Sequence, residues 1–298
     1  MKFKVFTYIG AYIIVSAIIQ LTSGGFPMHA LAFPVNIAAA MVWTGILYLL
    51  HHKRGDTEWM KVLAGGDCSI LALVLFIVGC LVLGFVPQQS TDTYSLWSRL
   101  GVFHFTTSWI FIAILLLLMT NLTLVVLRHR STDKWCQYRF LLNHIGLWLV
   151  LFALFFGAPD THKYRIMAYK NIPERMGYDV DAQPALLDFG LTLRSFHVDY
   201  YRNGTPSSYK AEVMVNHSPA TIEVNTPYTV SWKEKIYLVG YDVESGNQSP
   251  YCIFESVVQP WNYLILLGIV GMALGALLLF IHGSNKHRAG EEVNDVVE

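Results

Sequence analysis

Six long apolar stretches limit what this chain can fold into. They run from Val5 to Leu21, Phe33 to Leu50, Cys68 to Pro87, Val102 to Leu127, Phe140 to Gly157, and Trp261 to Ile281. A helix needs roughly 20 residues to cross the hydrocarbon core of a bilayer. Only 14% of the residues are charged, whereas a soluble domain carries about 25%. The sequence therefore predicts a polytopic α-helical membrane protein with about six transmembrane helices.

The positions of lysine and arginine predict how these helices are oriented, because positively charged loops stay on the cytoplasmic side. Basic residues gather at both ends of the chain and in alternate loops: Lys2, Lys4, Lys53, Arg54, Lys61, Arg128, Arg130, Lys134, Arg139, Lys286 and Arg288. This pattern predicts cytoplasmic termini, a location in the inner membrane, and residues 158–260 on the outer side. The first apolar stretch lacks a signal-peptide cleavage site and is interpreted as a retained helix.

Charge and cysteine spacing exclude several kinds of function. Lysine plus arginine and aspartate plus glutamate balance at 21 each, so no overall field favours a nucleic-acid partner. Cys68, Cys80, Cys136 and Cys252 form no CxxC pair and no Cys/His ligand spacing. Neither a thioredoxin-type redox site nor a structural zinc site is therefore expected.

The polar region between the fifth and sixth stretches reads as antiparallel β structure. Leu191 to Tyr201 and Tyr209 to Val215 alternate around a turn that contains Asn203-Gly204, which is the pattern of a β-hairpin. Further short strands are expected at Thr221 to Val224, Tyr228 to Trp232, Ile236 to Val243 and Tyr251 to Val257. Together they predict one small extracytoplasmic sandwich or barrel-like domain. Residues 161–189 have weaker periodicity, and their structure stays open.

His144 is an ionisable residue inside the fifth apolar stretch. It is four residues beyond the start of that stretch, or roughly 6 Å inside the cytoplasmic boundary by helical rise. The imidazole can donate to a carbonyl of a neighbouring helix or pair with Asn143. It can also be a haem or metal ligand or a proton relay. Residue type alone does not separate these roles.

The other histidines are expected nearer the two surfaces. His104 is at the outer start of the fourth stretch, about 20 Å from His144 in depth, too far to bind the same iron. His51, His52, His129 and His282 lie at or past cytoplasmic ends, where any of them could approach His144, although such residues are more often interfacial anchors or solvated than ligands. His29 and His162 are outer, and His197 and His217 fall in expected strands, where a structural or solvated role is usual.

Several motifs follow one another from Leu83 onward. They are Phe85-Val-Pro-Gln88, Trp97-Ser-Arg-Leu-Gly-Val-Phe-His-Phe-Thr-Thr-Ser-Trp109, Asn121-Leu-Thr-Leu, Asn143-His144-Ile-Gly146, Leu193-Arg-Ser-Phe-His-Val-Asp-Tyr-Tyr-Arg-Asn-Gly204, Ile222-Glu-Val-Asn-Thr-Pro227 and Lys235-Ile-Tyr-Leu-Val-Gly-Tyr241. In order and spacing they resemble the ResB (CcsB) family of system II cytochrome c biogenesis. On this resemblance, residues 1–67 are an added hairpin with a cytoplasmic loop, and 68–157 are a ResB-like three-helix part. Residues 158–260 are then the β domain, and 261–298 are the last helix with its tail.

The resemblance implies a haem lyase subunit that is non-catalytic or co-catalytic. With a CcsA-type partner and membrane lipid around it, such a subunit would carry haem b across the membrane and attach it to CxxCH of apocytochrome c. His144 corresponds to the family's transmembrane haem ligand, and the second axial ligand would come from the partner. His104 is a minor haem candidate. Arg128, Arg130 and Arg139 could attract the haem propionates, although their more ordinary role is to set topology.

Two other functions remain open. One is a haem b electron-transfer membrane protein, which generally requires paired histidines about 13 residues apart on one helix, and no stretch here has such a pair. The other is a membrane-anchored binding module whose β domain holds an exported partner. Gly271 and Gly275 in the last stretch have the spacing that permits close helix packing, within this chain or against a partner helix.

Overall fold

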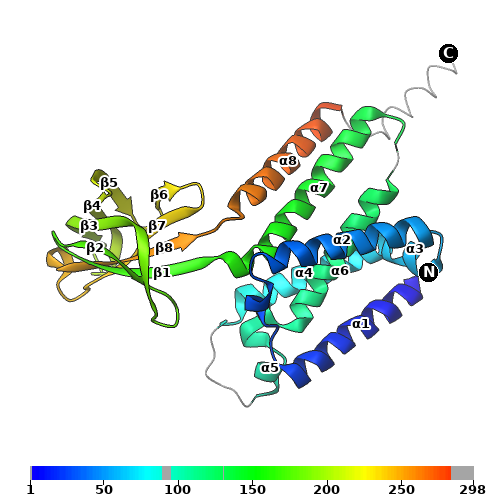
Figure 1. Ribbon diagram of the computed structural model, residues 1–298, viewed down its shortest axis with the longest axis horizontal. Helices are drawn as coiled ribbons and strands as arrows, with labels where there is room; N and C mark the ends of the chain where they lie inside the picture. Colours follow the sequence, from blue (N-terminus) through cyan, green and yellow to red (C-terminus); the bar gives the residue numbers. More distant parts are fainter. Residues whose placement is uncertain (1, 89–94, 130, 283–298) are drawn as a thin grey trace. The chain divides into compact units, whose positions relative to one another are not determined.

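The computed structural model describes residues 2–88, 95–129 and 131–282 (Figure 1). It divides into two compact units, Met1–Pro159 with Leu264–Glu298, and Asp160–Tyr263. Arg130 and the tail after His282, with Lys286 and Arg288, were used for the topology prediction and lie outside the described residues.

The first unit is helical. Within the described residues, six helices are long and apolar enough to cross a membrane, so the predicted fold class is confirmed. They are α1 (Lys2–Ser23), α2 (Val35–Arg54), α4 (Gly66–Phe85), α6 (Trp109–Arg128), α7 (Lys134–Phe156) and α8 (Asn262–His282). Shorter helical segments connect them: η1 (Met28–Leu31), α3 (Glu58–Leu63), α5 (Leu96–Arg99), η2 (Val102–Thr107) and η3 (Ala158–Asp160).

The fourth membrane helix begins later than its apolar pattern predicted. The expected start at Val102 is wrong, because residues 102–107 form the separate 3₁₀ segment η2 and α6 starts at Trp109. Gly101 has a φ of +76°, and His104 departs from helical geometry with φ −136° and ψ 50°. Ser108 then caps α6, its hydroxyl accepting from the Phe111 N–H at 3.2 Å. Such a serine cap satisfies a backbone donor that no helical carbonyl reaches.

Helix α6 is the centre of the membrane unit. It has the most buried residues of the six long helices, and it contacts α1, α2, α4 and α7. The N-terminal hairpin therefore packs against the rest of the unit. Polar side chains of α1 tie it there: the buried Gln20 carboxamide accepts from the Trp109 N–H at 3.0 Å, and the Tyr12 hydroxyl donates to the Ala113 carbonyl at 3.2 Å.

Asn36 connects the hairpin to α7. Its side chain is fully buried and its Nδ2 donates to the Phe156 carbonyl, at the last residue of α7, over 2.8 Å. We expect Asn36→Ala to lower the free energy of unfolding in micelles by about 1–2 kcal/mol, because a helix-end carbonyl loses its buried donor. Thr44→Ala on the same helix is the matched control, since within the described part of the chain that hydroxyl bonds only to carbonyls of its own helix. Equal unfolding midpoints for the two variants would contradict this role of Asn36.

The second unit is one antiparallel sheet, as predicted. Its strands run in the order β5-β4-β3-β2-β1-β8-β7-β6. The bounds are β1 (His162–Tyr169), β2 (Pro173–Tyr178), β3 (Pro184–Tyr200), β4 (Pro206–Val215), β5 (Ser218–Glu223), β6 (Tyr228–Ser231), β7 (Glu234–Tyr241) and β8 (Tyr251–Val258). The end strands β5 and β6 contact each other without being paired. The sheet therefore curls on itself in the barrel-like manner expected.

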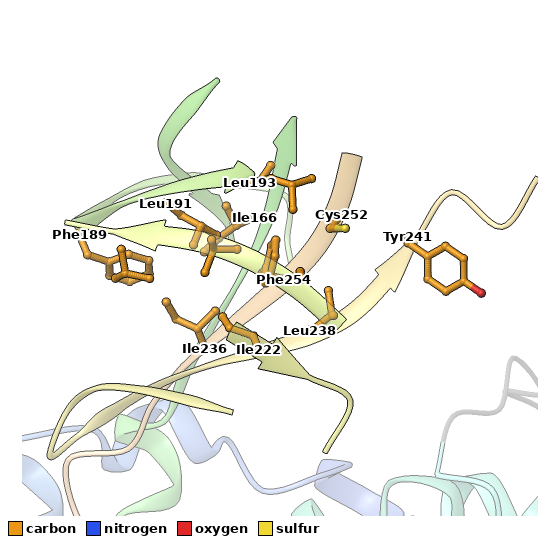
Figure 2. Close-up of a cluster of buried hydrophobic side chains, with 14 of the residues drawn as sticks. Ile166, Phe189, Leu191, Leu193, Ile222, Ile236, Leu238, Tyr241, Cys252 and Phe254 are labelled. Atoms are coloured by element: carbon orange, nitrogen blue, oxygen red, sulfur yellow. The ribbon is translucent and has the colours of Figure 1, made fainter. Parts of the chain in front are cut away.

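The hydrophobic core lies inside this curl. Phe189, Leu191 and Leu193 alternate along β3 and meet Ile166 of β1 and Phe254 of β8 (Figure 2). Alternate residues of a strand point to one face, which is why the longest strand supplies so much of the core. The segment with weak periodicity contains β1, β2 and the start of β3.

The turn predicted from the sequence is present, but one histidine that was expected in a strand lies in a turn. Gly204 has a φ of +80°, and the neighbouring Asn203 accepts from the Thr205 N–H, so the predicted turn is present. Asn225 has a φ of +63° and precedes a Thr226 N–H to Glu223 carbonyl bond. His217 was expected in a strand, which is wrong: it has a φ of +72° in the turn between β4 and β5.

Candidate functional site

His144 lies on α7 with one ring nitrogen already engaged. Its Nδ1 is 2.9 Å from the carbonyl oxygen of Phe140, one turn earlier on the same helix. A carbonyl can only accept, so this contact requires a proton on Nδ1, and in the neutral imidazole the lone pair is then on Nε2. The expected bond to a neighbouring helix or to Asn143 is not the one formed, because Asn143 Nδ2 donates to the Arg139 carbonyl instead.

An aromatic stack fixes the His144 ring from one side. Phe140 lies between two imidazoles, with ring centroids 3.9 Å from His144 and 3.6 Å from His129. Burial lowers the pKa of His129, and repulsion from His144 lowers it further. His129 is thus the cytoplasmic-end histidine that comes close to His144. With the phenyl ring between them, however, the two imidazoles do not face a common point.

A cavity of about 300 Å³ borders His144. Four helices line it, with residues from α4 (Ser69, Leu73), α6 (Leu118, Asn121, Leu122, Val125), α7 (Asn143, His144, Leu147) and α8 (Met272). The Asn121 and Asn143 amides are held by the carbonyls of Leu63 and Arg139. No hydrogen bond to the Nε2 of His144 occurs among the described residues. The cavity therefore offers an apolar wall and one imidazole nitrogen able to ligate.

Sequence reasoning missed the α4, α6 and α8 contributions to this cavity. Among these residues, Asn121 could have been recognised from the sequence, because an amide inside an apolar stretch needs a hydrogen-bond partner. Ser69 and Met272 carry no comparable signal, and only the packing of the helices identifies them.

Helices α7 and α8 run side by side (Figure 1), and glycines permit their close approach. A Cβ built on Gly146 would lie 2.7 Å from the Gly268 carbonyl oxygen, and one built on Gly268 would lie 2.6 Å from that of Gly146. A Cβ on Gly275 would lie 2.5 Å from the Asn143 amide nitrogen. The glycine spacing of the last helix thus serves packing within this chain, one of the two uses expected.

The other predicted site residues lie elsewhere. His104 is exposed in η2 and does not line the His144 cavity. Arg128 borders a separate polar cavity of about 570 Å³, together with His51, His52, Lys53, Arg54 and Lys61. Arg139 lies on α7 with its guanidinium 3.8 Å from the Cys136 sulfur. The structure thus does not bring Arg128 and Arg139 together around His144, and Arg130 and the side chain of His282 lie outside its description.

In the β unit, one histidine contacts an aspartate and one cysteine is buried. His197 Nε2 is 3.1 Å from Asp199 Oδ1 on the exposed face of β3. Burial raises the pKa of the Cys252 thiol to about 12, so this thiol stays protonated and poorly nucleophilic. Within the described residues, no cluster of three or more His, Cys, Asp or Glu side chains could hold a metal ion.

Part of the chain matches the model of a known protein family. Residues 131–262 match the model of the ResB-like family, from just before α7 to the first residue of α8. This part of the chain is ResB-like. The match contains Phe140, His144 and all eight strands of the β unit. It confirms the resemblance for the motifs from Asn143 onward, whereas the motifs between Phe85 and Leu124 lie before the matched residues. No curated protein matches the sequence.

One solved structure resembles the chain more distantly. It is a "Cytochrome c Heme Lyase CcmF", with 15% sequence identity and a TM-score of 0.36. The aligned region covers 82% of this chain and 40% of that one. The chain thus spans less than half the length of that structure.

Proposed function

We propose that this chain is a membrane subunit of cytochrome c biogenesis that carries haem b across the membrane, with His144 as one axial ligand. The observation that carries the proposal is the state of His144. It is an imidazole in a ResB-like helix beside an apolar cavity, with Nδ1 bonded to a carbonyl and with no hydrogen bond to Nε2 from the residues that the structure describes.

The donor set around His144 fits haem as a cargo. A neutral imidazole ligates haem iron well, and a carbonyl that accepts from its other nitrogen fixes the tautomer and the ring orientation. The apolar residues of the cavity, such as Leu73 and Leu118, suit a porphyrin face. Because Phe140 separates His129 from His144, the second imidazole ligand would come from another protein, a CcsA-type partner.

In this proposed function, the β unit binds apocytochrome c on the outer side of the membrane. Basic residues at the ends of α2 and α6 and at the start of α7 support a cytoplasmic location of those ends by the positive-inside rule, and we propose that both termini are cytoplasmic and that the membrane is the inner membrane. The chain would then be a co-catalytic or non-catalytic subunit, with haem attachment to CxxCH completed by the assembled complex.

Co-purification with a CcsA-type partner tests this function. The full chain is co-expressed with that partner and with a reporter apocytochrome bearing CxxCH. We expect a complex whose visible spectrum is that of low-spin, six-coordinate haem b, and a reporter that carries covalent haem only when both subunits are present. A stable complex that contains no haem and still binds the reporter would contradict haem carriage and indicate a binding module.

A further inference from the structure

One turn of the β unit lies beside the first residues of a membrane helix. Strands β6 and β7 are joined by the two-residue turn Trp232-Lys233. The Trp232 ring meets the Tyr263 ring edge-to-face, with centroids 5.7 Å apart. Tyr263 is the second residue of α8 and belongs to the same compact unit as the turn. This contact therefore fixes the position of the turn relative to the start of α8.

The start of α8 in turn gives the depth of Trp232 in a bilayer. Residues 262–281 form one of the helices that are long and apolar enough to cross a membrane. The first turn of such a helix lies where the hydrocarbon core meets the lipid headgroups. Leu266 and Leu267 are exposed, and at three and four residues beyond Tyr263 they share its face of the helix. The contact between Trp232 and Tyr263 thus places the turn at the headgroup level.

The Trp232 side chain contributes little to the folding of the β unit. It is 64% exposed, whereas Val230 before the turn and Ile236 after it pack in the core. Two-residue turns between strands usually carry Gly, Asn, Asp or Ser, and an indole held in water gains no stability from burial. A tryptophan ring is apolar with one polar N–H, which suits the boundary between water and hydrocarbon.

The backbone of the turn is held from behind. The Lys233 carbonyl accepts from the Gln259 N–H at 2.6 Å, in the segment that joins β8 to α8. The buried Ser256 hydroxyl donates to the Glu234 carboxylate at 2.7 Å, directly after the turn. Lys233 itself is exposed, so its ammonium group can reach a phosphate while its stem lies along apolar surface. The turn therefore presents an indole and a cation from a fixed backbone.

We propose that the β6–β7 turn is a lipid anchor, in which the Trp232 indole lies among the headgroups and ester carbonyls of the leaflet that α8 enters. Tyr263 lies beside it in the same layer, and Lys233 pairs with lipid phosphate. The anchor holds this end of the β unit at the bilayer surface. The inference depends neither on haem carriage nor on which side of the membrane the β unit occupies.

Fluorescence quenching in vesicles tests the anchor. The full-length chain is reconstituted in phosphatidylcholine and phosphatidylglycerol, with bromine either near the carbonyl end or at the middle of the phosphatidylcholine acyl chains. The Trp232 emission is the difference between wild type and Trp232→Phe. Bromine near the carbonyl end should remove at least about half of this emission, because indoles concentrate at the interface. Bromine at the middle of the chains and iodide in the water should each remove less.

A tryptophan at the other end of the β unit is the matched control. Tyr201 is exposed just beyond β3, and the Val198 N–H near the end of β3 donates to Asn247 at 2.7 Å, in the connection from β7 to β8. That connection is separated from the β6–β7 turn by the length of β7, eight residues or roughly 25 Å. Tyr201→Trp in a Trp232→Phe background should be quenched by iodide and not by brominated lipid.

Three results would overturn the anchor. Stronger quenching of Trp232 by iodide than by brominated lipid would put the turn in water, and protection from both quenchers would mean that protein covers it. Equal quenching by brominated lipid at positions 232 and 201 would remove the specificity. Hydroxyl-radical labelling of the wild-type chain in vesicles gives a second measurement that needs no variant, with Trp232 expected to be oxidised less than Tyr201. Haem content is scored separately, so failure here and failure of haem carriage are distinguishable.

Discussion

Replacing His144 by glycine or alanine should remove most of the haem b from the complex with a CcsA-type partner. The loss is expected to be at least about ten-fold in haem per complex, since removing even an outer-shell partner of a ligating histidine typically costs 10–100-fold in affinity. The measurement is the haem absorbance of the purified complex relative to protein. With His144→Gly, imidazole added to the medium should restore part of that absorbance, because it can enter the vacated space and ligate.

Two other histidine variants are the controls for that experiment. His129→Ala should keep the haem, because Phe140 lies between the His129 and His144 rings. His104→Ala should also keep it, since His104 is exposed in η2 and does not line the cavity. A wild-type spectrum in His144→Ala would refute the ligand role. Loss of haem in all three variants alike would point to general destabilisation and away from ligation.

Gly268→Leu should separate α8 from α7 and destabilise the membrane unit by at least about 2 kcal/mol. Even a Cβ at this position would lie 2.6 Å from the Gly146 carbonyl oxygen and 2.7 Å from the Val150 Cγ2. Backbone atoms cannot yield as a flexible side chain does, so the helices must move apart. The readout is the unfolding midpoint in micelles, together with haem content, because Met272 of α8 lines the His144 cavity.

Gly271→Ala is the control within the same helix. A Cβ on Gly271 has its nearest neighbour, the Leu142 carbonyl oxygen, at 3.6 Å, which is ordinary contact. Alanine is also the better helix former. We therefore expect a change of no more than about 0.5 kcal/mol. If Gly271→Ala were as damaging as Gly268→Leu, the explanation from backbone contact would be wrong.

Much of the fold could be read from the sequence because apolar length and alternation are local signals. All six long helices lie where the apolar stretches are, and the hairpin around Asn203 and Gly204 forms as expected. The error at Val102 has a physical cause. Composition measures how apolar a segment is, whereas the helix start is decided by the left-handed Gly101 and the Ser108 cap.

The site was only partly predictable. His144 stood out because an imidazole inside an apolar span is unusual. Its hydrogen bond to Phe140, the stacked His129 and the wall supplied by α4, α6 and α8 depend on rotamers and on helix packing, which have no sequence signature. The N-terminal hairpin likewise looked like an addition, and only the buried contacts of Gln20 and Asn36 reveal it as part of the bundle.

The two ends of the β unit are fastened to each other. The Trp261 indole donates to the Asp160 carboxylate at 2.7 Å, and the first strand pairs with the last from His162 and Val258 onward. The two positions at which the chain enters and leaves this unit are therefore adjacent. A short flexible linker could replace everything between those ends without stretching α7 or α8. The β unit is thus inserted between α7 and α8 through two adjacent chain ends, so a change in its length need not be transmitted to the membrane helices.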